Sequence, residues 1–321
     1  MPTKDDVRTA YRFILGREAE SEAVVEEHLS TARDIATLRR RFVGSPEFFN
    51  THSREVLRQA TEWAAGRRHG EVQVDCTPRE LALMFAHIRA VWSRLGEVEP
   101  HFSVVSHAAY KPGQIAAHLA SFLGTGREEA RMLAGELAGH GLPASGYRHC
   151  LEFGCGVGRV TRHLAALARR VTGIDVSAPH LVLARDHLAG EGVENVELAQ
   201  ITAPDGADLP ACDLLYSRIV LQHNPPPVML FLLRRLLAAI EPGGVGVFQL
   251  PVFLAGYRFD VAEYLAGMDR LDNQELHALP QKAVFRALAD ADCDVLACYR
   301  DNSLSRIDQM SNRFVVRKRM S

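Results

Sequence analysis

The chain has no large excess of charge of either sign and no apolar run long enough to span a bilayer. Its 321 residues include 37 Lys and Arg against 39 Asp and Glu, which gives a net charge of −2 at pH 7. This balance provides no general attraction for nucleic acid or for an anionic membrane. We therefore expect neither a nucleic-acid partner nor a membrane span.

The six cysteines are scattered, without a Cys-x-x-Cys pair and without histidines at the spacing of a zinc site. We expect them to be free, buried thiols, and we expect no metal. The N-terminus carries Lys4, Asp5 and Asp6 and does not resemble a secretory signal, so a cytoplasmic protein is expected. Since 47% of the residues are apolar, the chain can bury a full core and can contain more than one structural unit.

A glycine-rich turn follows a short apolar run, and its sequence over residues 152–158 is Glu-Phe-Gly-Cys-Gly-Val-Gly. The pattern predicts a strand from Arg148 to Phe153, followed by a turn in which glycines let the backbone approach a ligand closely. The next predicted strand ends at Asp175, about 20 residues past the first glycine, where a carboxylate can accept hydrogen bonds from ribose hydroxyls. A tight turn without a ligand would also select glycines, but the whole combination favours a cofactor site.

The spacing of the glycines distinguishes between cofactors. A dinucleotide-binding fold would have its third glycine or alanine at the position of Arg159, whereas this chain has Gly158 instead. An acidic residue, Glu152, stands two positions before the first glycine. This acidic-x-Gly-x-Gly-x-Gly pattern resembles the first motif of class I methyltransferases that use S-adenosylmethionine (SAM). The resemblance covers about residues 147–321.

The resemblance implies an α/β, Rossmann-like sheet of seven mostly parallel strands, with the last strand antiparallel. The strands expected in this part are 148–153, 171–175, 195–200, 212–217, 245–250, 294–300 and 313–318. It also implies SAM as cofactor, with the acidic residue of the motif helping to hold the ammonium group. The residues assigned to the cofactor are Glu152, Phe153, Gly154, Cys155, Gly156, Gly158, Asp175, Val176, Ile201, Thr202 and Ser217.

The adenine contact is less well defined. Many relatives carry an acidic residue after the third strand, where this chain has Ile201 and Thr202, with Asp205 and Asp208 slightly later. Ile201 could cover the ring, and Gln200 or Thr202 could bond its edge.

We divide the chain into an N-terminal helical module (1–68), a helical linker or lid (69–146) and a SAM-binding domain (147–321). Within the module, Gly16 is expected to end one helix and Ser45-Pro46 to start another. The segments Leu15-Gly16-Arg17-Glu18 and 42–48 resemble a short helical domain found in bacterial proteins, some of them glycan-processing. This suggests docking or homo-oligomerisation through these helices.

In the lid, Thr77 and Glu80 have capping-box spacing and predict a helix to about Leu95. We expect an extended segment over 99–105 and two further helices, 114–123 and 127–140. In many methyltransferases such a segment folds over the cofactor and forms a substrate lid. It supplies His101, Ser103 and Tyr110 as candidate acceptor-binding residues, with helix packing as their alternative role.

His223 is the candidate catalytic base, because it lies in the loop after the predicted fourth strand, where open α/β sheets bind ligands. A histidine titrates near neutral pH and can take the proton of an acceptor hydroxyl. Its alternative role is that of a buried histidine that bonds loop backbone. Arg218 and Gln222 share this loop and are expected to shape the pocket. Three further candidates for acceptor binding lie after the fifth strand: Tyr257, Arg258 and His277.

Together these features predict a SAM-dependent methyltransferase that acts on a hydroxyl, with a carbohydrate or glycoconjugate as acceptor. The carbohydrate depends on the N-terminal resemblance and on the aromatic loop around Tyr257. A nitrogen acceptor or a small metabolite is the alternative. A non-catalytic binding protein that retains the fold is the competing class, and a nucleotide-dependent oxidoreductase or epimerase is disfavoured by Gly158 beside Arg159.

Overall fold

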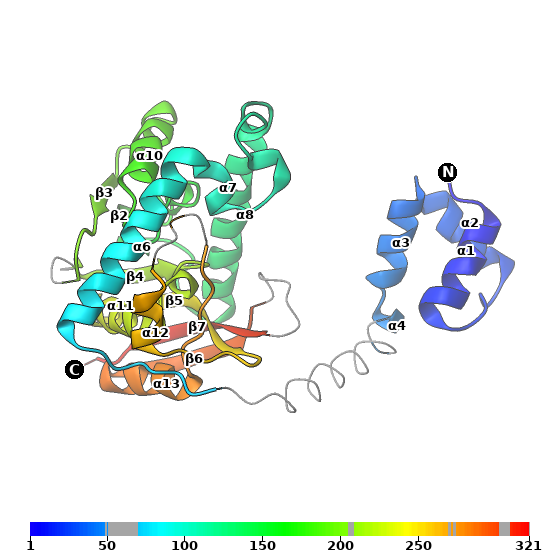
Figure 1. Ribbon diagram of the computed structural model, residues 1–321. Helices are drawn as coiled ribbons and strands as arrows, with labels where there is room; N and C mark the ends of the chain where they lie inside the picture. The colour runs from blue at the N-terminus through cyan, green and yellow to red at the C-terminus, as the bar shows by residue number, and fades with distance from the viewer. Residues whose placement is uncertain are drawn as a thin grey trace. The chain divides into compact units, whose positions relative to one another are not determined.

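The computed structural model of the chain describes residues 1–48, 50, 70–204, 209–268, 271, 274–301 and 309–320. The chain divides into two compact units, Met1–Arg68 and His69–Ser321 (Figure 1). None of the helices in these described ranges is both long enough and apolar enough to cross a membrane.

The N-terminal unit consists of short helices around a small core. They are α1 (Lys4–Ala10), η1 (Tyr11–Leu15), α2 (Glu22–Thr31), α3 (Ile35–Val43) and α4 (Pro46–Phe48). The predicted helix end at Gly16 is confirmed, because this residue has φ +72° and caps η1 in the left-handed conformation. The predicted start at Ser45-Pro46 is also confirmed, since the Ser45 hydroxyl accepts a hydrogen bond from the Phe48 amide at 3.1 Å. The buried core is formed by Val7, Tyr11, Leu15, Val25, Ala32, Leu38 and Phe42.

Seven strands of the second unit form one sheet among the described residues, in the order β3-β2-β1-β4-β5-β7-β6. The strands are β1 (Tyr147–Phe153), β2 (Ala168–Asp175), β3 (Val196–Gln200), β4 (Cys212–Ser217), β5 (Ile240–Leu254), β6 (Cys293–Arg300) and β7 (Gln309–Lys318). β7 runs antiparallel to both β5 and β6, and the other pairs are parallel. The predicted Rossmann-like sheet with an antiparallel last strand is confirmed.

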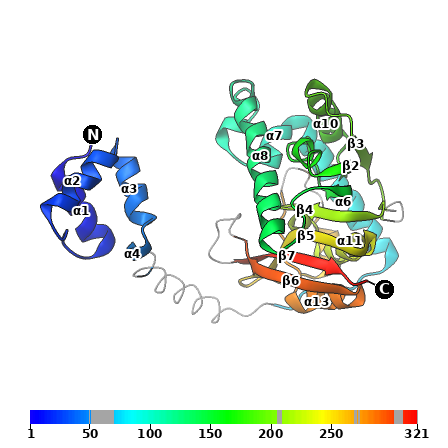
Figure 2. The ribbon, with the colours of Figure 1, turned by 180° about the vertical axis from the view of Figure 1, so that it is seen from behind.

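Helices cover both faces of this sheet (Figures 1 and 2). On one face, α6 (Pro78–Val98), α11 (Pro226–Ala239) and α13 (Gln281–Asp290) share a core with Leu215 of β4. On the other face, α8 (Ile115–Gly139) and α9 (Thr161–Leu164) share a core with Leu214. Successive residues of the central strands β1, β4 and β5 point to opposite faces and are buried on both, which explains the continuous apolar runs in the sequence. The remaining helices of this unit are α7 (Pro100–Val104), η3 (Ala108–Tyr110), α10 (Ala178–Gly190), η4 (Leu221–His223) and α12 (Val261–Ala266).

The lid differs from its prediction in two places. The extended segment expected over 99–105 is wrong, because Pro100–Val104 is a helix. Proline is tolerated in the first helical turn, where its missing amide hydrogen needs no partner. The two helices expected over 114–140 are one continuous helix, α8, which contains Gly124 and Gly126. The Thr77–Glu80 capping box is confirmed, although α6 ends at Val98 rather than near Leu95.

The first described residues after position 69 pair with the loop that follows β5. Val72 forms a parallel bridge with Phe259, and the Gln73 amide donates to the Phe259 carbonyl at 3.0 Å. The start of this unit is thereby attached to the loop after β5.

Candidate cofactor and acceptor site

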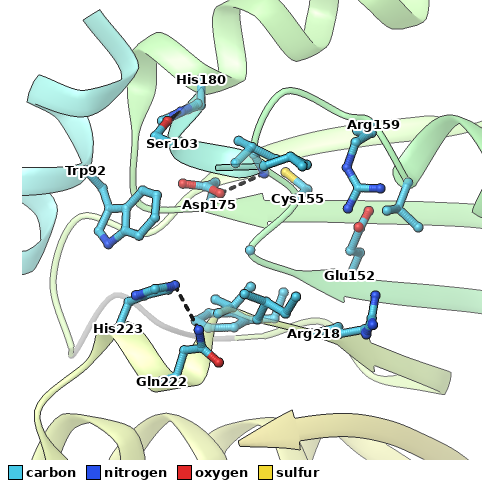
Figure 3. A pocket seen from close by; sticks show the side chains of 18 of the residues that line it. Trp92, Ser103, Glu152, Cys155, Arg159, Asp175, His180, Arg218, Gln222 and His223 are labelled. Atoms are coloured by element: carbon cyan, nitrogen blue, oxygen red, sulfur yellow. Dashed lines mark hydrogen bonds between the residues drawn. The ribbon is translucent and has the colours of Figure 1, made fainter. Parts of the chain in front are cut away.

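A cavity of about 630 Å³ opens at the carboxyl ends of β1, β2 and β4, where open α/β sheets bind their ligands (Figure 3). Residues of α6, α7 and α8 complete its wall, so the helices before the glycine motif cover the sheet end. The volume lies within the range of about 300–1,000 Å³ that is usual for small-molecule sites.

The glycine loop after β1 can be formed only by residues without a side chain at its critical positions. Gly154 has φ +79°, and a β-carbon there would lie 2.2 Å from the Val220 side chain. Gly156 has φ +54°, and its amide donates to Asp175 Oδ2 at 2.8 Å. The other carboxylate oxygen of Asp175 accepts from the Ser177 amide at 2.9 Å. Each oxygen has two lone-pair sites, so the carboxylate keeps capacity to accept from a ligand hydroxyl.

Glu152, at the end of β1, is a buried carboxyl that lines the cavity. Burial raises its pKa to about 8, although the nearby Thr161 hydroxyl acts in the opposite direction. Its Oε2 atom has no hydrogen-bond partner among the described residues. A buried polar atom without a partner is costly, and an ammonium group in the cavity would satisfy it. This atom therefore fits the amino group of the methionine part of SAM.

An ion cluster around Glu129 of α8 forms another part of the wall. The Glu129 carboxylate binds Arg159 at 2.8 Å and Arg218 at 3.2 Å, and it accepts from the Tyr216 hydroxyl at 2.7 Å. Burial disfavours the charged carboxylate, but the two guanidinium groups more than offset this, so the pKa of Glu129 lies below its ordinary value. The cluster joins α8, the glycine loop and the end of β4.

The lid is tied to the start of α10 by buried polar contacts. His180 bonds the Ser103 hydroxyl of α7 through Nε2 at 3.0 Å and the Ser177 hydroxyl through Nδ1 at 2.8 Å. Ser177 in turn donates to the Trp92 carbonyl of α6 at 3.0 Å. Val104 of α7 faces Gly156, where an added β-carbon would lie 3.1 Å from it. The lid helices are thus held directly over the glycine loop.

His223 lies at the cavity in a defined tautomer. Its Nδ1 atom is 2.7 Å from the Glu275 carbonyl oxygen. Because a carbonyl only accepts, Nδ1 carries the hydrogen and Nε2 is an acceptor. Burial lowers the pKa of the ring to about 4, so the imidazole is neutral. The Trp92 ring packs edge-on against it, with centroids 5.1 Å apart. His223 therefore bonds loop backbone, as its alternative role proposed, and its Nε2 atom faces the Gln222 amide at the cavity wall.

The structure brings together most of the residues predicted to bind the cofactor. Those that line the cavity are Glu152, Phe153, Gly154, Cys155, Gly156, Asp175 and Val176. Four others lie outside its lining: Gly158, Ile201, Thr202 and Ser217. Gly158 packs against Ala184 of α10, and the Ser217 hydroxyl donates to the Phe153 carbonyl at 3.0 Å, which joins the ends of β4 and β1. Asp205 and Asp208 lie outside the described residues.

Of the predicted acceptor-binding residues, Arg218 and Gln222 line the cavity, and so does Ser103. His101 and Tyr110 do not line it; both pack edge-on against Phe122, which agrees with their alternative role in helix packing.

The aromatic loop after β5 also lies outside the cavity lining. The Tyr257 hydroxyl is 2.8 Å from His277 Nδ1, and His277 Nε2 is 2.9 Å from the Glu275 carboxylate. Arg258 is exposed and paired with Glu263. These side chains are engaged with one another, and their assignment to acceptor binding receives no support from their positions.

Several lining residues were not predicted from the sequence: Ile88, Trp92, Ser106, Thr125, Glu129, Met132, Ile219 and Gln274. Most lie on the helices before the glycine motif, whose helical spacing shows that they pack but not what they cover. Arg159 offered a partial signal for Glu129. A charged side chain beside a tight turn needs an anionic partner if the fold buries it.

Part of the chain is similar in sequence to known methyltransferases. Residues 151–245 match the family described as "Methyltransferase domain". A trans-aconitate 2-methyltransferase of Paracidovorax citrulli is 38% identical over 116 residues, which are 34% of this chain and 41% of that protein. A ubiquinone biosynthesis O-methyltransferase of Aeromonas salmonicida is 33% identical over 104 residues, 30% of this chain and 40% of that protein. The crystal structure of N-methyltransferase NodS from Bradyrhizobium japonicum has a TM-score of 0.43 and 18% identity, over 60% of this chain and 85% of that chain.

Residues 151–245 thus form a methyltransferase domain, and the sheet order and glycine loop are those expected of the class I, SAM-dependent type. The interpretation of the glycine motif is confirmed. The chain spans 39–56% of the length of the curated relatives it matches. The matched family segment begins after the N-terminal module, whose resemblance to a bacterial helical domain stays a prediction.

Proposed function

We propose that the chain transfers a methyl group from SAM to a hydroxyl of a small molecule. The observation that carries this proposal is the combination, in one cavity, of an unpaired buried carboxyl oxygen on Glu152 and a neutral imidazole acceptor on His223. The first suits the charged end of the cofactor, and the second suits an acceptor that must lose a proton.

Each end of the cofactor has a matching group. Glu152 Oε2 would accept from the ammonium, and Asp175 would accept from the ribose hydroxyls. The Nε atom of Arg159 is buried without a hydrogen-bond partner among the described residues, and it suits the carboxylate. When bound, SAM supplies a methyl group that is already electrophilic. The residues of the cavity then have to position the acceptor and exclude water, which can supply about 7–11 kcal/mol.

His223 Nε2 is the atom that takes the proton from the acceptor hydroxyl. The hydrogen bond from Nδ1 to the Glu275 carbonyl fixes the ring and stabilises the charge that the ring gains. A base in this position contributes roughly 10²–10⁴-fold to the rate.

The size of the cavity and the relatives favour a small metabolite over the glycan expected from the sequence. The volume of about 630 Å³ has to hold both cofactor and acceptor. The aromatic loop that suggested a sugar lies outside the lining, and the matched relatives are named for trans-aconitate and for ubiquinone biosynthesis. A location in the cytoplasm and assembly through the N-terminal helices are part of the same proposal.

A carboxylic acid acceptor is the second candidate. The guanidinium group of Arg218 belongs to the cavity wall and could bind an anionic acceptor. A carboxylate is already deprotonated and needs no base, so this candidate predicts that His223 is dispensable for the chemical step.

The test begins with binding of labelled SAM to the purified chain. Saturable binding that is lost in Gly156→Asp and kept in Gly192→Asp supports the site; Gly192 has a similar φ of +65° but open space around it. Absence of binding at millimolar cofactor would refute the proposal and favour a non-catalytic protein.

His223→Ala then separates the two acceptor classes in a screen of small hydroxyl and carboxyl compounds. A loss of turnover of about 10²-fold or more with unchanged cofactor affinity supports a hydroxyl acceptor. Near-normal turnover on an acid would establish the second candidate.

A further inference from the structure

The backbone leaves β4 through a strained residue at the cavity wall. Ile219 has φ +57°, in the left-handed region that β-branched residues avoid. Such a conformation costs about 1–3 kcal/mol and persists only where the surroundings impose it. Ile219 lies between Arg218 and Val220, and all three line the cavity.

Gln249 of β5 holds this turn. It is buried, and its Oε1 atom accepts from the Ile219 amide at 2.8 Å. An amide N–H can only donate, so the orientation of the Gln249 side chain follows directly from this contact. The Nε2 atom of Gln249 must then be the donor to its two other partners, Gln222 Oε1 at 3.2 Å and the Ser311 hydroxyl.

The orientation of Gln249 also determines the hydrogen bond between Gln222 and the candidate base, His223. Because Gln222 accepts through Oε1, its Nε2 atom is the one that faces His223 Nε2, at 3.3 Å (Figure 3). Gln222 therefore donates, and His223 Nε2 accepts. The Glu275 carbonyl requires the same tautomer from the opposite side of the ring. Two independent groups, the Ile219 amide and the Glu275 carbonyl, thus give His223 one proton arrangement.

We propose that Gln249 is a positioning residue for methyl transfer, which holds the strained turn and, through Gln222, keeps His223 Nε2 as a hydrogen-bond acceptor toward the cavity. The inference rests on the proposed function. The inference also narrows the choice of substrate. A methyl-accepting molecule that takes the place of the Gln222 amide at His223 Nε2 has to donate a hydrogen. The acceptor class that this arrangement selects is a hydroxyl or phenol rather than an ionised carboxylate.

Gln249→Glu reverses the direction of donation. The ionised carboxylate that this substitution introduces accepts from Ile219 and from Gln222 but cannot donate, so the Gln222 amide turns and presents its oxygen to His223. His223 then requires hydrogens on both nitrogens. The titratable groups facing the ring, Glu275 and His277, are unchanged, as is His87 on α6 behind Glu275. We therefore expect a higher pKa of His223 in this variant.

Imidazole ¹⁵N NMR of the full chain measures the protonation state of His223 and needs no methyl-accepting substrate. The wild type should show a neutral ring with hydrogen on Nδ1 at neutral pH, and Gln249→Glu should show a ring that protonates at higher pH. Turnover of the variant at neutral pH should fall about tenfold or more, with acceptor KM and cofactor affinity within about threefold. The activity should recover as pH rises and the ring loses its extra proton.

Ser311→Ala is the matched control, because it removes the other partner of Gln249 Nε2 and leaves the path to His223 intact; its ¹⁵N spectrum should match the wild type. Gln249→Met is the neutral second variant if the buried charge prevents folding, and the same loss of turnover is expected from it. A wild-type ring with hydrogen on Nε2, or unchanged His223 signals and turnover in both Gln249 variants, would overturn the inference. Absence of SAM binding by the wild type would instead refute the proposed function.

Discussion

Gly126 of α8 lies so close to Arg159 that a β-carbon at position 126 would stand 1.9 Å from the Arg159 carbonyl oxygen. This contact brings the lid helix against the turn that follows the glycine motif. Arg159 is held on the other side by Glu129, one helical turn further along α8. The glycine is therefore a packing residue that sets the distance between helix and loop.

Gly126→Ala should destabilise the protein, because the backbone of helix or loop has to move. We expect a loss of about 1–3 kcal/mol in the free energy of unfolding, measured by denaturant titration. Gly124→Ala is the matched control in the same helix, with open space around its β-carbon, and should stabilise by up to about 1 kcal/mol. Equal effects of the two substitutions would show that the close contact does not exist.

Glu129→Gln should also destabilise, because the largely buried guanidinium groups of Arg159 and Arg218 lose their shared anion. Breaking a buried pair by removing one partner costs about 3–5 kcal/mol. The neighbouring Glu128 is exposed and pairs only with Arg131 one turn away among the contacts described, so Glu128→Gln should change stability by less than about 1 kcal/mol. Chemical denaturation of both variants at neutral pH provides the measurement. A mild effect of Glu129→Gln would mean that water reaches the cluster.

The sequence predicted the sheet and the glycine loop because both depend on local patterns. Apolar runs, caps and glycine spacing determine where β1 ends and where Asp175 lies, and neither needs distant partners. The lid was predicted less well, since Gly124 and Gly126 resemble helix breakers until the contact with Arg159 is known. The roles of Gln249 and Glu129 could not be predicted, because they depend on partners 27 or more residues away in the chain.

The ring of Trp92 on α6 lies near two histidines, with centroids 5.1 Å from His223 and 6.2 Å from His180. Trp92→Ala should enlarge the acceptor side of the cavity and loosen the wall beside the base. We expect a rise in acceptor KM of about tenfold, equivalent to roughly 1.4 kcal/mol, with cofactor affinity little changed. Trp92→Phe keeps an aromatic ring in the wall, so its acceptor KM should lie between those of the wild type and Trp92→Ala. A larger loss in SAM binding than in acceptor KM would place Trp92 against the cofactor instead.

The raised pKa of Glu152 makes both stability and cofactor affinity depend on pH. Between its ordinary value of 4.5 and about 8, the folded chain holds a proton that the unfolded chain has released. The contribution of Glu152 to the free energy of unfolding therefore falls as pH rises through this interval. Glu152→Gln removes this dependence, so the variant should be more stable than the wild type at about pH 8 and similar to it near pH 5.

Cofactor binding should show the opposite trend, because the ammonium group pairs with the ionised carboxylate. Wild-type affinity for SAM or S-adenosylhomocysteine should rise from about pH 6 to about pH 8, while the affinity of Glu152→Gln should be lower and nearly independent of pH. Calorimetric titrations at several pH values, paired with thermal unfolding of the same samples, measure both quantities. Parallel pH dependences in wild type and variant would show that Glu152 is not the group that receives the ammonium.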